Sequence, residues 1–508
     1  MRGQNVSGFV YEDRNINALR DSSERGLSGI PVSNGREVVL TSSDGAYNLP
    51  MGPSGVVFVI KPKGYRFLAD GEGQSKSYYV HSEKGSSKKL KYTGIKPTGP
   101  LPRSVDFGLI ADPTEENSFS VLLFGDTQVS NEKEVEYLQR SVIDELEGTR
   151  SAAFGITLGD LVNNVLDLLP DYKGAIDRIG LPWYHVIGNH DHNQDVADDS
   201  LASETFRAVL GPENYAVNYG KVHLLVLDDI LFPDPKGESQ YWGGYREDQL
   251  TFIKNDLKHV PHDRLVIIAQ HIPLFNESGD SFNTRDRSQL FELLRPFENV
   301  LLLSAHTHYQ MHHFFGPEEG WYGVKPLHEY NVGTVCGDWW SGDFHADPKC
   351  PDGTMRDGTP RGFAYIDVNG TDYKLRYEVQ GADPSMGMRL YNTRVVDADD
   401  GRGILTANIF MGRVGDIVEY SIDGGEWRPM TKVLLPDPSY AQMVMEYDEE
   451  RDTLKDGRRP NNPIICSHIW SAGLPRKTTP GEHIIKVRTI DSYGREYMSE
   501  TTFRSIKR

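Results

Sequence analysis

Short apolar runs in the middle of the chain predict buried strands. They are Val121–Phe124, Val222–Leu227, Leu265–Ile268 and Val300–Leu303. Between them, apolar residues recur three or four positions apart, most clearly over residues 132–147, and this spacing predicts amphipathic helices. Buried strands that alternate with such helices predict an α/β core whose sheet is covered by helices.

The pattern differs at both ends of the chain. Residues 5–112 alternate short β-branched runs with turn dipeptides such as Asn34-Gly35 and Asp44-Gly45, which predicts a small all-β sandwich that resembles prealbumin-like modules. From about Met386, strand patterns and glycine turns predict a second sandwich, of Ig-like type. With 508 residues, the chain is long enough for three domains, and we place them at 1–112, 113–385 and 386–508.

Composition narrows the class of partner. Hydrophobic residues make up 38% of the chain and charged residues 25%, values typical of a soluble globular protein. No apolar run reaches the ~18 residues that a membrane-spanning helix needs. The formal net charge of −19 argues against nucleic acid as the main partner. A small phosphate ester remains compatible, because bound metal ions would dominate the local field.

The compartment is only weakly indicated. Residues 1–6 lack the apolar core of a signal peptide, so the protein stays inside the cell or the chain is a trimmed mature form. Given the surface-type N-terminal module, we expect a periplasmic, cell-surface or secreted location, with a cytoplasmic one as the alternative. Among the three cysteines, Cys336 and Cys350 could close a loop in an oxidising compartment, and Cys466 would stay unpaired.

One polar segment near the N-terminus has the spacing of a calcium loop. Its candidate ligands at positions 1, 3, 5, 9 and 12 are Asp13, Asn15, Asn17, Asp21 and Glu24. Ala18 replaces the glycine expected at position 6, so the turn there would be strained. A solvated polar loop over residues 13–24 is the alternative.

Metal-binding residue types follow five apolar runs. The segments are Gly125–Gln128, Gly159–Asn164, Gly188–His192, Gln270–Pro273 and Ala305–His308. Two divalent ions roughly 3.5–4 Å apart can neutralise a phosphoryl group and ionise a water molecule, and such a pair needs a bridging carboxylate with oxygen and imidazole ligands. Asp160 is the natural bridge. We expect Asp126, Gln128 and His308 at one ion and Asn189, His271 and His306 at the other.

Together these blocks resemble the calcineurin-like metallophosphoesterase superfamily, over roughly residues 118–380. The resemblance implies a four-layer αββα sandwich and the seven ligands Asp126, Gln128, Asp160, Asn189, His271, His306 and His308. It implies that a metal-bridging hydroxide attacks phosphorus in line. The resemblance also implies that His190 is not a ligand but the acid that donates a proton to the leaving-group oxygen, or a residue that steadies the phosphoryl charge.

Three positions depart from the superfamily pattern. Gln128 replaces the usual histidine, which should weaken the first metal site or favour harder ions such as Mn or Mg. Asn163 and Asn164 stand where purple acid phosphatases carry their tyrosine, so a ferric-tyrosinate centre is not expected. Ala305 replaces a glycine, a change between small residues.

Substrate contacts are predicted from residues near the ligands. The segment 337–345 carries adjacent Trp339 and Trp340 among carboxylates, as expected of a surface that stacks sugar or aromatic rings. In the alternative, one of the two tryptophans packs under the sheet. Asn164, His192 and Tyr309 are further candidates for substrate contact.

The sequence therefore predicts a three-domain phosphoesterase with two divalent ions, drawn from Mn, Zn, Fe and Mg. Its substrate would be a small phosphodiester or phosphomonoester, or a phosphorylated glycan or lipid headgroup. A noncatalytic, glycan-binding surface protein with a structural metal centre is the alternative.

Overall fold

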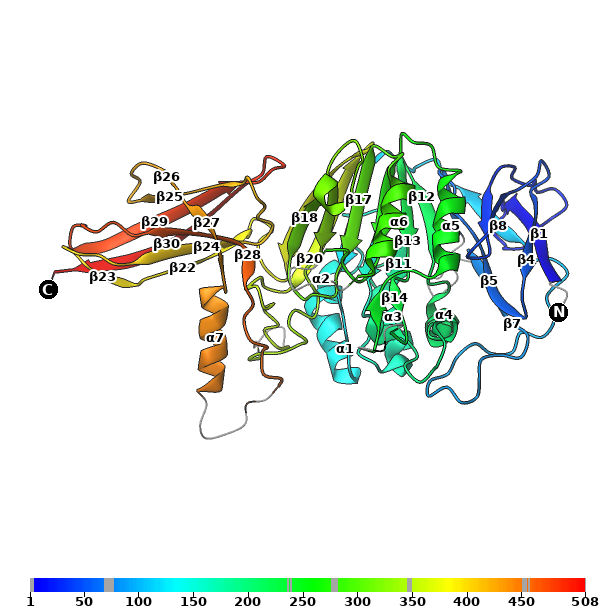
Figure 1. The fold of residues 1–508 in the computed structure, drawn as a ribbon, viewed down its shortest axis with the longest axis horizontal. Coiled ribbons are helices and arrows are strands. Elements are labelled where there is room, and N and C mark those ends of the chain that lie inside the picture. Colours follow the sequence, from blue (N-terminus) through cyan, green and yellow to red (C-terminus); the bar gives the residue numbers. More distant parts are fainter. Residues whose placement is uncertain are drawn as a thin grey trace.

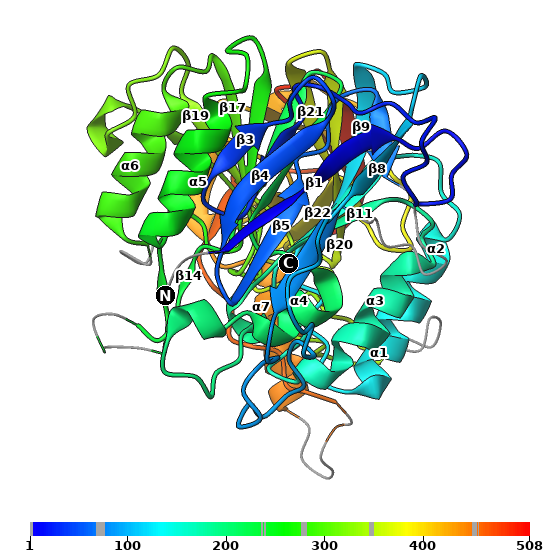
Figure 2. The same ribbon diagram turned by 90° about the vertical axis from the view of Figure 1, so that its right-hand side faces the viewer.

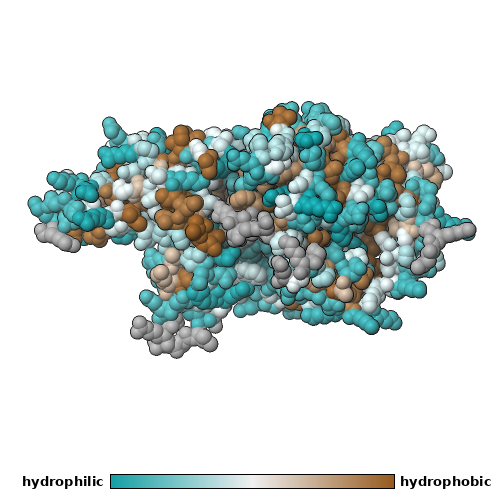
Figure 3. Space-filling model, in the orientation of Figure 1, coloured by the Kyte–Doolittle hydropathy of each residue, from teal (hydrophilic) through white to brown (hydrophobic). Residues whose placement is uncertain are grey.

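The computed structural model describes residues 4–67, 77–234, 237, 240–275, 282–344, 350–449, 455 and 457–507. Figure 1 shows three parts in a row, with the N-terminal strands at one end, a mixed core in the middle and the C-terminal strands at the other end. None of the helices in these ranges is long and apolar enough to cross a membrane. Hydrophilic and hydrophobic residues are intermixed over the face shown in Figure 3.

The N-terminal part is a sandwich of two four-stranded sheets, ordered β4-β1-β8-β6 and β3-β2-β5-β7. Apolar residues such as Val10, Val32, Val57 and Leu109 alternate with polar ones along the strands and meet between the sheets. The strands are β1 Gln4–Glu12, β2 Pro31–Ser33, β3 Val38–Leu40, β4 Ala46–Met51, β5 Ser54–Val59, β6 Tyr65–Phe67, β7 Tyr78–Ser82 and β8 Phe107–Ala111. The predicted all-β fold of this part is confirmed.

The core holds two facing sheets. The first has the order β11-β10-β9-β20-β21, and its strands are β9 Ser118–Phe124, β10 Phe154–Leu158, β11 Trp183–Val186, β20 Gly362–Asn369 and β21 Asp372–Val379. The second has the order β12-β13-β16-β17-β19-β18, and its strands are β12 Tyr215–Tyr219, β13 Val222–Val226, β16 Leu265–Ala269, β17 Asn299–Ser304, β18 Met311–Phe315 and β19 Leu327–Asn331. A small hairpin, β14 Ile230–Leu231 and β15 Trp242–Gly243, stands apart.

Helices cover the outer faces of both sheets (Figure 2). On β9, Val121 and Leu123 face the other sheet, whereas Leu122 and Phe124 pack against the helices. The helices are α1 Glu132–Leu138, α2 Asp144–Leu146 and α3 Leu169–Asp177 on one side, α5 Glu247–Leu257 and α6 Thr284–Leu294 on the other, and α4 Glu204–Leu210 near the edge. Strands β10, β13 and β16 are buried over their whole length, so each shows a nearly continuous apolar run. The predicted four-layer αββα fold is confirmed.

The helix predicted over residues 132–147 contains a widened turn. Between α1 and α2 the chain forms a π-helix, Gln139–Ile143. The side chain of Asn131 caps the start of α1 by accepting the N–H of Glu134. Val135, Leu138, Val142 and Leu146 are all buried, so the predicted apolar face is correct.

The C-terminal part is a second sandwich, with sheets ordered β22-β24-β28-β27 and β23-β30-β29-β25-β26. The strands are β22 Met388–Asn392, β23 Val395–Asp397, β24 Ile404–Ile409, β25 Ile417–Ile422, β26 Arg428–Pro429, β27 Thr431–Leu435, β28 Cys466–Gly473, β29 Gly481–Ile490 and β30 Glu496–Ile506. Helix α7, Pro438–Asp448, was not predicted; it starts with Asp437 as N-cap and Pro438 in the first turn. The exact domain boundaries stay predictions.

A buried ion pair joins the N-terminal sandwich to the core. Lys61 Nζ lies 2.8 Å from Glu115 Oε2, and both side chains are almost fully buried. Lys61 also donates to the carbonyl of Asn218, and Glu115 accepts the N–H of Gly220. These contacts fix how the two parts meet.

The loop 13–24 is held by its own carboxylates. Asp13 is buried and accepts the N–H groups of Asn17 and Ala18. Glu24 accepts those of Arg14 and Asp21. Ala18 has a φ of 59°, the left-handed value expected to be strained at this position. Calcium binding there stays a prediction.

Candidate metal centre

The predicted ligands converge at one edge of the two facing sheets. Each follows the carboxyl end of a core strand, where ligands of α/β sheets gather. Asp126 and Gln128 follow β9, Asp160 follows β10, Asn189 follows β11, His271 follows β16, and His306 and His308 follow β17. The structure thus brings together all seven residues that the sequence singled out.

Four of them form the first ligand group. His271 Nε2 lies 3.1 Å from Asn189 Oδ1, 3.1 Å from His306 Nδ1 and 3.3 Å from Asp160 Oδ2. Ligand atoms of Asp160, His271 and His306 all lie within 4.8 Å of one another. Carboxylate, amide oxygen and imidazole atoms that face one another at this range form the donor set of a divalent ion.

The second group shares Asp160 with the first. His308 Nε2 lies 3.1 Å from Asp126 Oδ2, and Gln128 Nε2 lies 2.9 Å from Asp160 Oδ2. Apart from this approach of His308, the buried Asp126 Oδ2 has no hydrogen-bond partner among the described residues, which fits a carboxylate oxygen that binds a cation. The amide of Gln128 would present its oxygen to an ion after a half-turn, since the two orientations have nearly the same shape.

Hydrogen bonds from the rear orient the ligands. His271 Nδ1 lies 2.8 Å from the carbonyl of Leu158, and His308 Nδ1 lies 2.9 Å from that of Gly337, so each ring turns Nε2 toward the centre. Asp126 Oδ1 accepts the N–H of His306.

Burial and charge oppose each other within the first group. Burial favours the neutral form of Asp160, but the neighbouring His271, His190 and His306 outweigh it and lower the pKa of Asp160. Burial also disfavours charge on His271, yet Asp160 raises its pKa to about 10. Burial and the adjacent His271 lower the pKa of His306 to about 4. Without metal, the group thus holds a proton on His271, in the place where a cation would neutralise Asp160.

Three buried carboxylates that the sequence analysis missed anchor the ligand loops. Asp191 accepts N–H groups of Leu161, Val162 and Gly188, Asp229 those of His271 and Ile272, and Glu329 those of Leu274 and Phe275. Burial raises the pKa of Asp229 to about 8, and burial together with Asp160 raises that of Asp191 to about 7. For Asp229, the available signal was an acidic residue within three positions of the end of the buried strand β13.

His190 stands at the rim of the centre and not among the ligands. It lies on the short 3-10 helix Asn189–Asp191, and its side chain is 20% exposed. Its Nε2 lies 3.9 Å from Asp160 Oδ2, and its N–H donates to Asp160 Oδ1. A partly exposed imidazole beside the ligands is placed to reach a bound substrate.

The backbone is strained at this centre. Positive φ values in the left-handed region occur at Gln128, Asp160, Asn164, His306, His308, Trp339 and Trp340. Such values cost of order 1–3 kcal/mol each and cluster at functional sites. Gly188 belongs to the same arrangement, because a Cβ there would lie 2.2 Å from the nitrogen of Asp160.

The two adjacent tryptophans have different surroundings. Trp339 is partly exposed, stacks on His308 at 4.8 Å and meets the edge of His190 at 5.5 Å. Trp340 is buried, donates its indole N–H to the carbonyl of Thr127 and packs near Tyr137. The prediction of substrate contact is therefore wrong for Trp340, because its ring fills the core. Residue 345, the last of the predicted segment, lies outside the described residues.

The other predicted contact residues also differ in exposure. His192 is buried, with Nε2 3.5 Å from Asp228 Oδ1, so it cannot meet a substrate as predicted. Asn164 is partly exposed, and its N–H donates to the carbonyl of His190. Tyr309 is partly exposed next to His308. Tyr241 packs edge-on to His306, with ring centres 6.1 Å apart. The sequence analysis missed it, because it belongs to no recognisable motif.

All three cysteines are buried and none forms a disulfide, so the suggested Cys336–Cys350 bridge does not form. Cys336 Sγ lies 3.9 Å from Gln128 Oε1 and from His308 Nδ1, behind the second ligand group. Cys350 Sγ accepts a hydrogen bond from Arg361.

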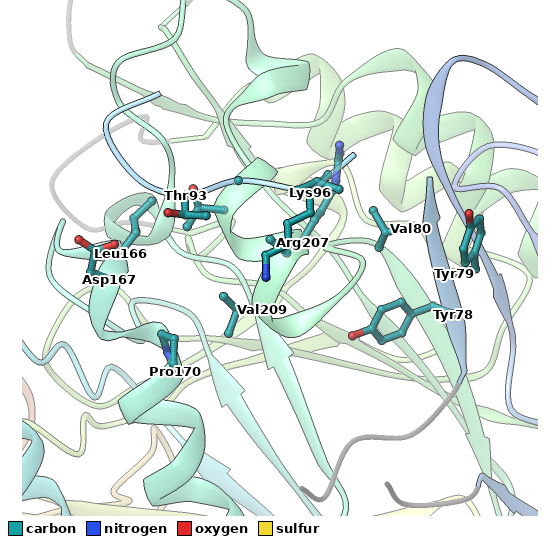
Figure 4. A pocket seen from close by; sticks show the side chains of 14 residues that line it. Tyr78, Tyr79, Val80, Thr93, Lys96, Leu166, Asp167, Pro170, Arg207 and Val209 are labelled. Carbon is teal, nitrogen blue, oxygen red and sulfur yellow. The ribbon is translucent and has the colours of Figure 1, made fainter. Parts of the chain in front are cut away.

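A cavity of about 630 Å³ lies away from the ligands, between the N-terminal sandwich and the core (Figure 4). Tyr78 and Val80 of β7 form one wall, and Asp167 and Arg207 of the core form another. Arg207 is engaged with Glu213 in an ion pair, and Lys96 also lines the cavity.

Models of one protein family match three stretches of the chain. Residues 14–96 match the N-terminal part of calcineurin-like phosphoesterases, residues 119–310 match the calcineurin-like phosphoesterase domain, and residues 329–497 match the C-terminal part. A curated relative, the probable glycerophosphodiester phosphodiesterase GpdQ of Arcobacter nitrofigilis, is 25% identical over 145 residues. The match covers 27% of this chain and 49% of the relative, so the chain spans about half of that protein.

Similarities to solved structures are weaker. The purple acid phosphatase PPD1 of yellow lupin has a TM-score of 0.32 and 12% identity, over 82% of this chain and 66% of that one. GAP50 of Plasmodium has a TM-score of 0.32 and 14% identity, over 52% of this chain and 84% of that one.

Proposed function

The chain belongs to the calcineurin-like metallophosphoesterase superfamily, and from this premise we propose that it hydrolyses small phosphodiesters or phosphomonoesters with two divalent metal ions. One observation carries the proposal. Two groups of ligand atoms meet at one oxygen of the same carboxylate, Oδ2 of Asp160, an arrangement that fits a two-metal centre with a shared carboxylate. The similarity to a protein named as a phosphodiesterase supports phosphodiesters as the substrate class.

Asp160, Asn189, His271 and His306 would hold one ion, and Asp126, Gln128, Asp160 and His308 the other. Such ions neutralise charge on the phosphoryl group and lower the pKa of bound water. Divalent ions fit the atoms present, because Asp126 Oδ2 is buried and available to a cation and the ring nitrogens of His271 and His306 face each other. Gln128 favours Mn or Mg over Zn or Fe, because an amide oxygen is a harder ligand than imidazole.

His190 supplies the proton in this proposal. Its side chain is partly exposed with Nε2 3.9 Å from Asp160 Oδ2, and its ring Nδ1 has no hydrogen-bond partner among the described residues. The backbone N–H of His190 donates to Asp160, which holds the backbone of this residue beside the ligands. From there it can donate to the oxygen of the departing alcohol.

Turnover of bis-p-nitrophenyl phosphate and p-nitrophenyl phosphate tests the proposal. We expect activity to disappear on chelation and to return with added Mn, and the ratio of the two rates ranks diester against monoester. A noncatalytic, glycan-binding protein would bind metal yet turn over neither substrate. That outcome would refute the proposed activity.

Two further parts of the proposal concern the N-terminal sandwich. We place the protein outside the cytoplasm, and fractionation of the native cells that found it only in the cytosol would refute this. Calcium is proposed for the loop 13–24, on the spacing of Asp13 and Glu24. A melting temperature that Ca²⁺ does not raise in the metal-loaded protein would argue against calcium there.

A further inference from the structure

A segment of the C-terminal part is built into the wall of the metal centre. Asp338 accepts the N–H of Asn461 at 2.6 Å and its Nδ2 at 2.8 Å. The N–H of Gly342 donates to the carbonyl of Arg458 at 2.9 Å, and Ser341 pairs with Arg458 as an isolated bridge. In Figure 1 this segment leads from the region of α7 into β28. The loop 337–342 that follows the core sheets is thus tied to residues 457–461.

This connection is rigid. Asp338 is fully buried, and Tyr440 of α7 donates to the carbonyl of Asn461 at 2.9 Å. The same loop carries Trp339 and Trp340 in left-handed conformations, with φ of 60° and 53°. Residues other than glycine adopt such conformations only where the surroundings hold them. The position of Arg458 is therefore set by the same contacts that set Trp339.

Arg458 lies over Trp339, next to the ligands. Its guanidinium carbon is 4.7 Å from the centre of the indole, and the indole stacks on the ligand His308 at 4.8 Å. One ring thus separates the arginine from the metal centre. Arg458 is exposed, and no carboxylate of the described residues lies within ion-pair distance of it. In a chain with a formal net charge of −19, an arginine without such a partner at this place stands out.

The chemistry of the side chain indicates what it binds. A guanidinium presents a planar fork of N–H donors that fits carboxylate or phosphate oxygens. One indole ring away from the ligands, it cannot share the phosphoryl group held at the centre. It can reach a second anionic group on the same substrate.

We propose that Arg458 and Trp339 form a subsite for a second anionic group, so that the preferred substrates are phosphoesters whose organic part carries an additional carboxylate or phosphate. This deepens the proposed function and rests on it for the identity of the scissile group. It also gives the C-terminal part a role, because the subsite is incomplete without residues 457–461.

A matched pair of ligands tests the subsite. 6-Phosphogluconate and sorbitol 6-phosphate differ only in a carboxylate that replaces a CH₂OH group. Their dissociation constants would be measured by calorimetry on the Mn-loaded protein, with hydrolysis of bis-p-nitrophenyl phosphate followed in parallel. We expect the carboxylate to tighten binding by about 3- to 10-fold, a modest factor because solvent screens an exposed arginine.

Arg458→Ala should abolish this preference, and Arg458→Lys should keep only part of it, because an ammonium lacks the fork. Lys455 provides the control. It lies near Arg458 in the chain but is engaged with Asp343 at 3.1 Å, so Lys455→Ala should leave the preference unchanged.

The outcomes separate the two proposals. Equal binding of the two ligands by the unaltered protein, binding of neither, or an unchanged preference in Arg458→Ala would each overturn the subsite. If Arg458 only braces Trp339, its replacement would weaken the binding of both ligands equally. That result would also overturn the subsite. A preference that depends on Arg458 without hydrolysis of either bis-p-nitrophenyl phosphate or p-nitrophenyl phosphate would support the subsite and refute the proposed activity.

Discussion

Replacing Asp160 with Asn tests the shared position in the two ligand groups. The amide has the same size as the carboxylate, and its oxygen can still accept the N–H of His190 at 2.9 Å. Oδ2, the atom that faces both His271 and Gln128, becomes an NH₂ group that cannot bind a cation. We expect the fold to persist, metal content to fall from about two ions per chain toward one or none, and hydrolysis to be lost.

The size of the effect can be followed in the metal-free protein. Burial alone would hold the pKa of His271 below its ordinary value, but Asp160 raises that pKa to about 10. Without the carboxylate, the pKa of His271 should fall, because only the weaker effects of Asp126 and Asp229 then oppose burial. Each unit by which this pKa falls corresponds to about 1.4 kcal/mol of interaction between the side chains of Asp160 and His271.

NMR titration of labelled histidines in the chelated protein measures this shift. The folded-state pKa of His271 lies above its unfolded value, so its contribution to stability is complete below pH ~6.5 and is lost as pH rises toward 10. The chelated parent protein should therefore lose stability between about pH 7 and 10, and Asp160→Asn should lose less.

Asp256→Asn is the matched control, because Asp256 is also buried and lies 2.6 Å from a histidine, His223, away from the centre. It should keep both metal ions and full activity. If Asp160→Asn retains two ions at the parent's affinity, or leaves the titration of His271 unchanged, the shared role of Asp160 is wrong.

Three other predictions address single residues. His190→Asn should lower the rate by roughly 10²–10⁴ with metal content unchanged, and less for a p-nitrophenol leaving group than for an alkyl alcohol; loss of metal would make His190 a ligand. Gln128→His should raise affinity at its site and shift preference from Mn toward Zn in metal-competition assays, whereas unchanged affinity and rate in Gln128→Ala would exclude Gln128 as a ligand. Glu115→Ala should lower the free energy of unfolding by roughly 3–5 kcal/mol in denaturant titrations, because it leaves Lys61 buried without its partner; a loss below about 1 kcal/mol would contradict this.

The strands and the ligand set were predictable for the same physical reason. In a four-layer fold each central strand is buried on both faces, so it appears as a short apolar run, and the first polar residues after it lie at the sheet edge. Asp126, Asp160 and His271 each stand two residues after the end of such a strand. The residues that meet in the centre could therefore be predicted from their positions just after the apolar runs.

Other features left no such trace. The π-helical turn 139–143 does not disturb the spacing of the apolar residues around it, so the pattern predicts an ordinary helix. Helix α7 buries only Tyr440 and Val444, too few residues to give a clear apolar face. Trp339 is partly exposed and Trp340 is buried because of a left-handed turn that composition does not reveal.

The strained backbone explains why the exact site could not be deduced from residue types. Asp160 and His306 take left-handed conformations that neither residue prefers, with φ of 50° and 68°. The carboxylate of Asp191 offsets part of that cost by accepting three N–H groups from the loops around Asp160. A buried carboxylate with three such bonds holds a loop in one shape, so the ligands meet before any ion arrives. The sequence predicts which side chains would bind metal, whereas the point at which they meet depends on partners such as Asp191 that lie outside the predicted ligand set.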